Sequence, residues 1–311
     1  MKKIRPVHKI KKKLSVGNIT FNFFNYFILL FFTVLCIFPF YYLFINTISS
    51  NELSARGEIF FLPREIHFSN YWQVFRIPGL IRATQVSLMR TIIGTILPVL
   101  TAGYVGFMFT QPMWARRFWY RFVVASMYIH AGLIPWFLTL VMLGFQNSFW
   151  VYIIPGIMQP FSILLVKTYV ESTPVSLQES AEMDGAGTMT IFIRIILPLI
   201  KPILATVAIF AAVGQWNAFM DTLLFITTDT LHTLQFVLYR YISQAGALAR
   251  LVQQAGVIGG GVGDFANLAT QQTATSVRMT VTIIVTLPIL FVYPFFQKYF
   301  VQGIMIGAVK G

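Results

Sequence analysis

The sequence predicts an all-α integral membrane protein with six transmembrane helices and both termini in the cytoplasm. Hydrophobic residues make up 57% of the 311 residues and charged residues only 11%, whereas about a quarter of a typical soluble domain is charged. Long segments contain no Asp, Glu, Lys or Arg, namely residues 14–51, 91–115, 122–166, 202–220 and 279–297. Because a spanning helix needs about 20 apolar residues, each of these segments can supply at least one.

The charge-free segments divide into six expected spans. The run over residues 122–166 is long enough for two helices, and its polar break at Gln146, Asn147 and Ser148 suits a hairpin between them. The spans are expected near residues 22–47, 86–110, 119–144, 149–170, 200–226 and 277–300.

The distribution of basic residues sets the expected orientation. The net charge is +13. With six spans, the side that holds both termini collects 15 Lys and Arg residues, and the other side collects 8. The positive-inside rule therefore places both termini in the cytoplasm. The basic tail at residues 1–20 is expected to anchor this orientation and to favour anionic membrane lipid, and no nucleic-acid partner is expected.

The sequence offers little for catalysis or cofactor binding. Cys36 is the single cysteine and lies in the first expected span, and the four histidines are scattered. No metal site is therefore expected. No G-x-x-x-x-G-K-[ST] phosphate loop occurs, so this chain is not expected to bind ATP in that manner. If transport is driven by ATP, the motor is a separate polypeptide.

An unusual acidic segment separates the fourth and fifth expected spans. Residues 172–187 are predicted to form a short helix, capped by Ser172 or Thr173, with Pro174 in its first turn. Gly185 or Gly187 is expected just past its end. A second short helix is expected over residues 188–196, stopped by Pro198, with Pro202 opening the next span. The residues alone also allow an ordinary amphipathic loop on the membrane surface.

The spacing in this segment resembles the EAA loop of ABC-importer permeases. The pattern E-[AS]-A, then D-G-A three residues later, then L-P, matches Glu179, Ser180, Ala181, Asp184, Gly185, Ala186, Leu197 and Pro198. Ser180 stands where the family often has Ala. The resemblance implies that these residues form a coupling helix, which seats in a groove on the ATPase.

Two further segments resemble the carbohydrate branch of that family. Residues 215–221, QWNAFMD, look like its W-N-x-F segment, and residues 297–311 look like the ending of maltose-type (MalG-like) subunits. The tail and the long last loop also resemble the subgroup that includes LplC, YtcP and the alginate-importer permeases.

The resemblance to carbohydrate permeases implies a domain order and a set of partners. The expected order is a basic tail at 1–20, a first span with its external loop at 21–83, and the permease core at 84–311. The expected partners are a second permease subunit, two ATPase subunits that bind ATP and Mg, and an extracellular sugar-binding protein. The location would be a bacterial cytoplasmic membrane, and the substrate a complex oligosaccharide.

Polar residues inside spans are candidates for the substrate pathway, because they are costly in lipid and usually face a cavity or a partner. They are His130, Gln159, Gln215, Trp216, Asn217 and Asp221. Trp216 and Asn217 suit a sugar, yet packing between helices of two subunits explains them equally well. Asp221 is expected either in water or paired with an Arg. An ion-coupled secondary transporter is the alternative function, for which only His130 could serve as the coupling group.

Overall fold

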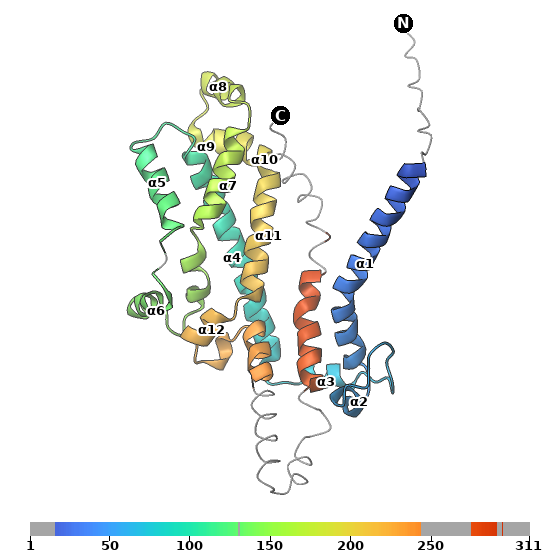
Figure 1. The fold of residues 1–311 in the computed structure, drawn as a ribbon. Helices are drawn as coiled ribbons and strands as arrows, with labels where there is room; N and C mark the ends of the chain where they lie inside the picture. Colours follow the sequence, from blue (N-terminus) through green and yellow to red (C-terminus); the bar gives the residue numbers. More distant parts are fainter. Residues whose placement is uncertain (1–15, 130, 244–274, 291–293, 295–311) are drawn as a thin grey trace.

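The computed structural model describes residues 16–129, 131–243, 275–290 and 294, and every regular element in these residues is helical. The chain forms an elongated helical bundle, with the helix α8 at one end and the short helices α2 and α3 at the other (Figure 1). His130, most of the long loop after residue 243 and the tail after residue 294 lie outside the described residues.

The first helix, α1 (Val16–Thr47), is long and largely separate from the bundle. Its side chains are exposed over residues 20–40, and Figure 1 shows this part diverging from the other helices. Its last turns are buried against the segment that contains α2 (Asn51–Ala55) and α3 (Ser69–Phe75). Asn46 anchors this contact, because its amide oxygen accepts a hydrogen bond from the Ser54 hydroxyl at 2.8 Å.

Three helices form the centre of the bundle: α4 (Leu80–Met108), α7 (Pro160–Glu171) and α11 (Lys201–Asn217). Glycines of α4 allow α7 and α11 to approach it closely. A β-carbon at Gly94 would lie 2.7 Å from the Gln215 side chain of α11, and one at Gly106 would lie 2.9 Å from the Val166 side chain of α7. Small residues at such contacts are typical of membrane helix packing.

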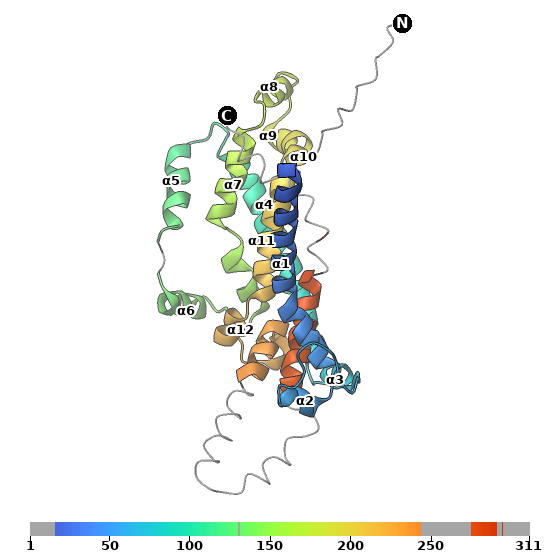
Figure 2. The same cartoon turned by 45° about the vertical axis from the view of Figure 1, so that its right-hand side comes forward.

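The expectation of one continuous helix over residues 119–144 is wrong. The structure has α5 (Arg116–Ser126) and α6 (Leu133–Met142), which run in different directions in Figures 1 and 2. Gly132 has φ +82°, and Pro135 lies in the first turn of α6. Because proline has no N–H, it is tolerated in a first turn but breaks a helix that arrives from upstream.

The fourth and fifth expected spans are also broken. Residues 149–170 form η1 (Phe149–Tyr152), η2 (Ile154–Gly156) and then α7, with a 43° bend. Residues 200–226 form α11 and α12 (Met220–Phe225), separated where Ala218 becomes extended, with ψ 127°. The expected turn before residue 149 is confirmed: Asn147 adopts φ +54°, and its side-chain oxygen accepts a hydrogen bond from the Thr227 N–H at 2.7 Å.

Two described helices are individually long and apolar enough to cross a membrane, Thr20–Thr47 and Leu80–Met108. The number rises to four if each bent pair, Phe149–Gly156 with Pro160–Glu171 and Thr188–Leu199 with Lys201–Asn217, counts as one span. The last expected span begins as a helix over residues 275–290, and its expected continuation to residue 300 lies outside the described helix.

Candidate functional site: a helical elbow and a buried polar cluster

The acidic segment folds as a helical elbow, which we define as residues 176–199. Its first helix is α8 (Ser176–Met183). The expected capping by Ser172 or Thr173 is wrong. Their hydroxyls instead donate to the carbonyls of Tyr169 and Val170, at 2.6 and 2.7 Å, so they close the end of α7. Helix α8 begins after Val175, without a side-chain cap.

Gly185 ends α8 as expected. It has φ +79°, in the left-handed region where a β-carbon is unfavourable. Its N–H donates to the Glu182 carbonyl at 3.0 Å, and the next N–H, of Ala186, reaches the Ala181 carbonyl at 2.9 Å. The left-handed residue thus satisfies the last carbonyls of the helix and reverses the chain.

The second part of the elbow is longer than expected. Helix α9 (Thr188–Ile191) continues through η3 (Phe192–Ile196), a π-helix, into α10 (Leu197–Leu199). Pro198 therefore does not stop the helix. The wider π turn directly before it accommodates the missing N–H and the ring. The helix ends at Ile200 with a 78° bend into α11, which Pro202 opens as predicted.

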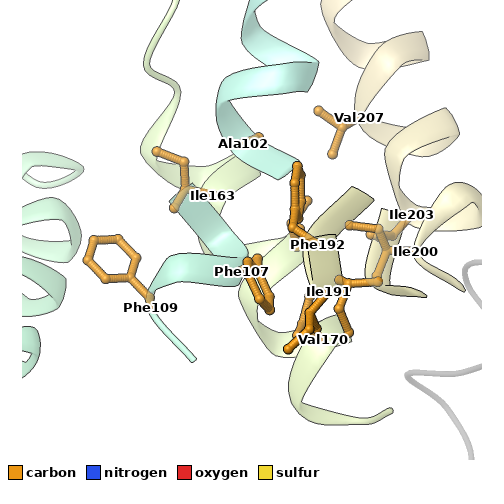
Figure 3. Packing of buried hydrophobic residues seen from close by; sticks show 12 residues of the cluster. Ala102, Phe107, Phe109, Ile163, Val170, Ile191, Phe192, Ile200, Ile203 and Val207 are labelled. Atoms are coloured by element: carbon orange, nitrogen blue, oxygen red, sulfur yellow. The ribbon is translucent and has the colours of Figure 1, made fainter. Parts of the chain in front are cut away.

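The elbow is fixed to the bundle by an apolar contact. Ala181, Ala186 and Leu197 pack against a buried cluster that includes Phe107 of α4 and Phe192 of the elbow. The rings of Phe107 and Phe192 are stacked with centroids 5.4 Å apart (Figure 3). A hydrogen bond of 2.8 Å from the Gln111 side chain to that of Gln178 adds a polar link between α8 and the end of α4. These contacts join α8 to α4 and, through the buried cluster, to α11.

The outer face of the elbow combines charge with apolar side chains. Glu179, Ser180, Glu182 and Asp184 are exposed, as are Val175 and Met183, the latter with 88% of its surface accessible. Pro198 is also exposed. This face therefore offers both carboxylates and flexible apolar side chains to a partner.

A second group of polar residues lies in the bundle toward the end opposite the elbow. Arg90 of α4, whose side chain is 3% exposed, forms an ion pair with Asp221 of α12. Its Nε donates to Gln215 Oε1 at 2.8 Å, and its Nη1 donates to the Ala218 carbonyl at 3.1 Å. Arg90 thus satisfies the carbonyl that the break between α11 and α12 leaves without a helical partner.

Tyr152 of η1 completes this polar cluster. The Arg90 guanidinium lies 4.5 Å from the centre of the Tyr152 ring. The Tyr152 hydroxyl makes a 3.0 Å hydrogen bond with the Thr222 hydroxyl and donates to the Leu231 carbonyl at 2.8 Å. The cluster therefore holds α4, η1 and α12 together at the points where two spans are broken.

The structure separates the remaining substrate-pathway candidates. Trp216 is 6% exposed and its indole N–H donates to the Val285 carbonyl at 3.0 Å, so its ring is part of the core. Asn217 is exposed and its side-chain oxygen accepts a hydrogen bond from Gln235. Gln159 precedes α7 and accepts from the Ser162 hydroxyl. His130 lies outside the described residues.

Arg90 is the member of the polar cluster that the pattern of charge-free segments missed. The charge-free run starts at Thr91, which places Arg90 at its external edge. Helix α4 begins at Leu80, ten residues before Arg90, and the Arg90 side chain is buried. The available signal was a lone Arg inside a segment expected to span the membrane, because buried charges in such segments are paired. The pairing proposed for Asp221 is confirmed.

A small cavity lies at the same end of the molecule, beside the start of α4. It has a volume of about 360 Å³ and is lined by Ile77, Pro78, Gly79, Asp229, His232, Val237, Arg240 and Tyr241. Burial lowers the pKa of His232 below its usual value of 6.5; the carboxylate of Asp229, 3.3 Å away, opposes this effect and Arg240 reinforces it.

The described residues thus form a bundle of apolar helices with a helical elbow projecting from one end, an architecture suited to a membrane subunit. The model of the family of binding-protein-dependent transport system inner membrane components matches residues 114–306. This match covers more than half of the chain. The chain therefore belongs to that family, and it is a multi-pass protein of the bacterial cytoplasmic membrane.

Similar proteins extend the comparison over nearly the whole chain. Protein LplC of Bacillus subtilis is 33% identical over 280 residues, which cover 88% of this chain and 90% of LplC. The polygalacturonan/rhamnogalacturonan transport system permease protein YtcP of the same species is 28% identical over 295 residues, 94% of this chain and 99% of YtcP.

The solved structures include a close match in fold. A chain from the crystal structure of a bacterial ABC transporter that imports the acidic polysaccharide alginate superimposes with a TM-score of 0.78 at 26% identity. The match covers 92% of this chain and 98% of that chain. Other relatives that match most of the chain are permeases named for oligosaccharide transport. One is the arabinooligosaccharides transport system permease protein AraQ of Halalkalibacterium halodurans, which is 25% identical over 267 residues, 84% of this chain and 86% of AraQ.

Proposed function

We propose that this chain is the permease subunit of an ATP-driven importer of complex oligosaccharides. It receives sugar from an extracellular solute-binding protein and passes it to the cytoplasm. The observation that carries the proposal is the elbow: a short helix ended by a left-handed glycine, packed on the core cluster and joined to α11 through a single bend. The names of YtcP and AraQ support the oligosaccharide class.

The elbow is the coupling helix in this proposal. Glu179 and Asp184 offer carboxylates to basic or backbone donors in a groove of the ATPase, and Val175 and Met183 bury apolar surface there. A charge-assisted hydrogen bond of this kind contributes about 1.5–3 kcal/mol when it is shielded from water. The ATPase subunits, two per complex, bind ATP and Mg, and this chain supplies neither hydrolysis nor a cofactor site.

The orientation follows from charge and from the position of the elbow. The beginning of α1 lies at the same end of the molecule as α8 (Figure 1). That end also carries Arg116 and Arg117, consistent with the excess of basic residues that marks the cytoplasmic side. The proposal therefore keeps six spans, of which the third, fourth and fifth are broken helices, and both termini in the cytoplasm.

A second, homologous permease subunit completes the pathway. Many apolar side chains of α1 and α6 are exposed in the isolated chain, including Phe32 and Ile134. Lipid and the second subunit cover such surfaces in a membrane complex. Within this chain, Gln215 and Trp216 are engaged in packing contacts, whereas Asn217 reaches the surface. We therefore assign Asn217 as the pathway residue to test first.

The experiment is reconstitution of this chain in vesicles with a second permease subunit, an ATPase and a solute-binding protein. Uptake of a labelled oligosaccharide should require all four components and ATP. The binding protein, screened against a glycan panel, identifies the sugar. ATP hydrolysis by the purified single chain, or uptake driven by an ion gradient without the ATPase, would contradict the proposal.

A further inference from the structure

The start of α5 carries a group of arginines without acidic partners. Arg116, Arg117 and Arg121 are exposed. No acidic residue occurs between Glu65 and Glu171 in the sequence. Among the described residues, none of the three arginines forms an ion pair. The Arg116 side chain donates a hydrogen bond to the Thr110 carbonyl at 3.3 Å. The positive charge on this face is therefore available to an anionic ligand.

The same turn is hollowed. An open depression of about 600 Å³ is lined by Pro112, Met113, Ala115, Arg116 and Arg117. Ala115, the residue before α5, has φ +53°, a left-handed conformation that is uncommon for a residue with a β-carbon. The turn thus has a defined shape, with two guanidinium groups at the edge of a concave surface.

Aromatic side chains lie directly beside the arginines. Trp114 is 84% exposed, and Phe118 and Phe122 are 61% and 59% exposed, with their rings stacked one helical turn apart at 6.4 Å. The opposite face of α5, with Tyr120 and Val123, packs against the core cluster. Exposed rings that point away from the bundle suit acyl chains, and tryptophan beside them is typical of the depth of lipid headgroups.

Lys167 of α7 contrasts with these arginines, because it forms an ion pair within the chain. Its ammonium group lies 2.8 Å from a Glu171 carboxylate oxygen and 4.6 Å from the centre of the Tyr120 ring. The basic group of α7 is thus neutralised within the chain, whereas the arginines of α5 are not. An ordinary anchor needs only charge, but this face adds a depression and exposed aromatic rings.

We propose that Arg116, Arg117 and Arg121 bind the phosphate of an anionic phospholipid whose acyl chains lie against Phe118 and Phe122. Guanidinium groups form two parallel hydrogen bonds with phosphate oxygens. A water-soluble partner such as the ATPase would account for the arginines but would leave the adjacent phenylalanines without a contact. The lipid accounts for both. The site goes beyond the proposed transport function.

The test measures quenching of tryptophan fluorescence by brominated lipid in vesicles that contain the full chain. Acyl-brominated phosphatidylglycerol is compared with acyl-brominated phosphatidylcholine at the same low mole fraction. Phosphatidylglycerol should quench more strongly, and the excess should disappear in Trp114→Phe/Trp119→Phe, which removes the two reporters at the site. Both leaflets hold the lipid, so the result does not depend on the proposed orientation or on transport.

Substitution of the arginines tests whether they cause the stronger quenching by phosphatidylglycerol. Arg117→Gln/Arg121→Gln should weaken the preference for phosphatidylglycerol about fivefold for each arginine removed. Arg117→Lys/Arg121→Lys keeps the charge but loses the paired guanidinium hydrogen bonds, so it should retain part of the preference, which also shows that changes at these positions leave the fold intact. Arg64→Gln/Arg76→Gln, a pair of exposed arginines at the other end of the molecule, should leave it unchanged. Equal quenching by both lipids, or a preference that survives the glutamine pair, would overturn the proposal. Loss of ATPase co-purification with an unchanged lipid preference would assign the arginines to the ATPase instead.

Discussion

Arg90 of α4 and Asp221 of α12 form an ion pair across 131 residues of sequence, and the guanidinium is almost fully buried. The same group binds Gln215 and the Ala218 carbonyl, so its hydrogen-bonding groups are directed at the break between α11 and α12. A break in a spanning helix exposes backbone groups to an environment without water. Arg90 therefore makes that break compatible with the membrane, and Asp221 neutralises the charge that this requires.

Removal of one partner of this pair should destabilise the protein strongly. Asp221→Leu leaves the buried Arg90 charge uncompensated, which costs about 3–5 kcal/mol in comparable buried pairs. Arg90→Met should cost a similar amount, because it also leaves the Ala218 carbonyl without its donor. The double variant Arg90→Met/Asp221→Leu should be less destabilised than the sum of the two. Thermal unfolding of the purified chain in detergent measures all three.

Arg82 provides the control for this prediction. It lies on the same helix but is exposed, and its Nε donates to the Thr230 carbonyl at 3.3 Å. Arg82→Met should cost about 1 kcal/mol or less, as expected for one exposed hydrogen bond. If Arg82→Met and Arg90→Met lowered the melting temperature equally, the buried pair would have no special role in the fold.

Gly106 of α4 is predicted to tolerate a larger residue poorly. A β-carbon there would lie 2.9 Å from Val166 Cγ1 and 3.1 Å from the Ile163 carbonyl oxygen, and a backbone atom cannot move aside. Gly106→Ala should therefore cost about 1–3 kcal/mol. Gly103→Ala is the matched control, because its nearest neighbour would be a Leu204 methyl group at 3.4 Å. Equal melting temperatures for the two variants would contradict the close contact of α4 and α7.

The sequence was sufficient to place the elbow and the two spans expected near residues 22–47 and 86–110, because these depend on local properties. A span is marked by the absence of charge, and the end of α8 is marked by Gly185, whose conformation favours glycine. The break between α5 and α6 was also encoded locally, at Gly132 and Pro135, but the apolar composition of the run concealed it.

Other features could not be predicted because they depend on contacts between distant residues. The break at Ala218 involves neither proline nor glycine and is held by Arg90, 128 residues away. The roles of Gln215 and Trp216 likewise depend on their partners, Arg90 and the Val285 carbonyl. Residue type alone made Trp216 a candidate for sugar binding, whereas its burial makes it part of the core.

His232 should make stability depend on pH at the end opposite the elbow. Burial lowers its pKa below 6.5, so between the lowered value and 6.5 the folded state binds fewer protons than the unfolded state. Stability therefore rises with pH through this window and is lost as the pH falls. His232→Gln should flatten the dependence, and Arg240→Gln should reduce it because Arg240 also lowers this pKa. Identical pH profiles of thermal unfolding in the wild type and His232→Gln would contradict the prediction.

The elbow gives the most direct test of coupling. Import requires that motion of the ATPase becomes a rearrangement of the spans, and the second part of the elbow continues through a 78° bend into α11. Gly185→Val forces a β-branched residue to φ +79°, a region that costs a residue with a β-carbon about 1–2 kcal/mol or more. Gly187→Val is the control, because Gly187 has φ −70° and no atom within 4 Å of an added β-carbon.

Gly185→Val should abolish both ATPase co-purification and sugar uptake, because it disrupts the turn that orients the whole docking face. Glu179→Ala removes one exposed carboxylate and should reduce uptake less severely, since Asp184 and the apolar side chains remain. Gly187→Val should retain assembly, and insertion into the membrane should be normal in all three variants. The decisive comparison is between the two glycines, which lie two residues apart and differ in backbone conformation. If Gly185→Val assembled and transported as well as Gly187→Val, the elbow would be an ordinary surface loop and the ATPase would dock elsewhere.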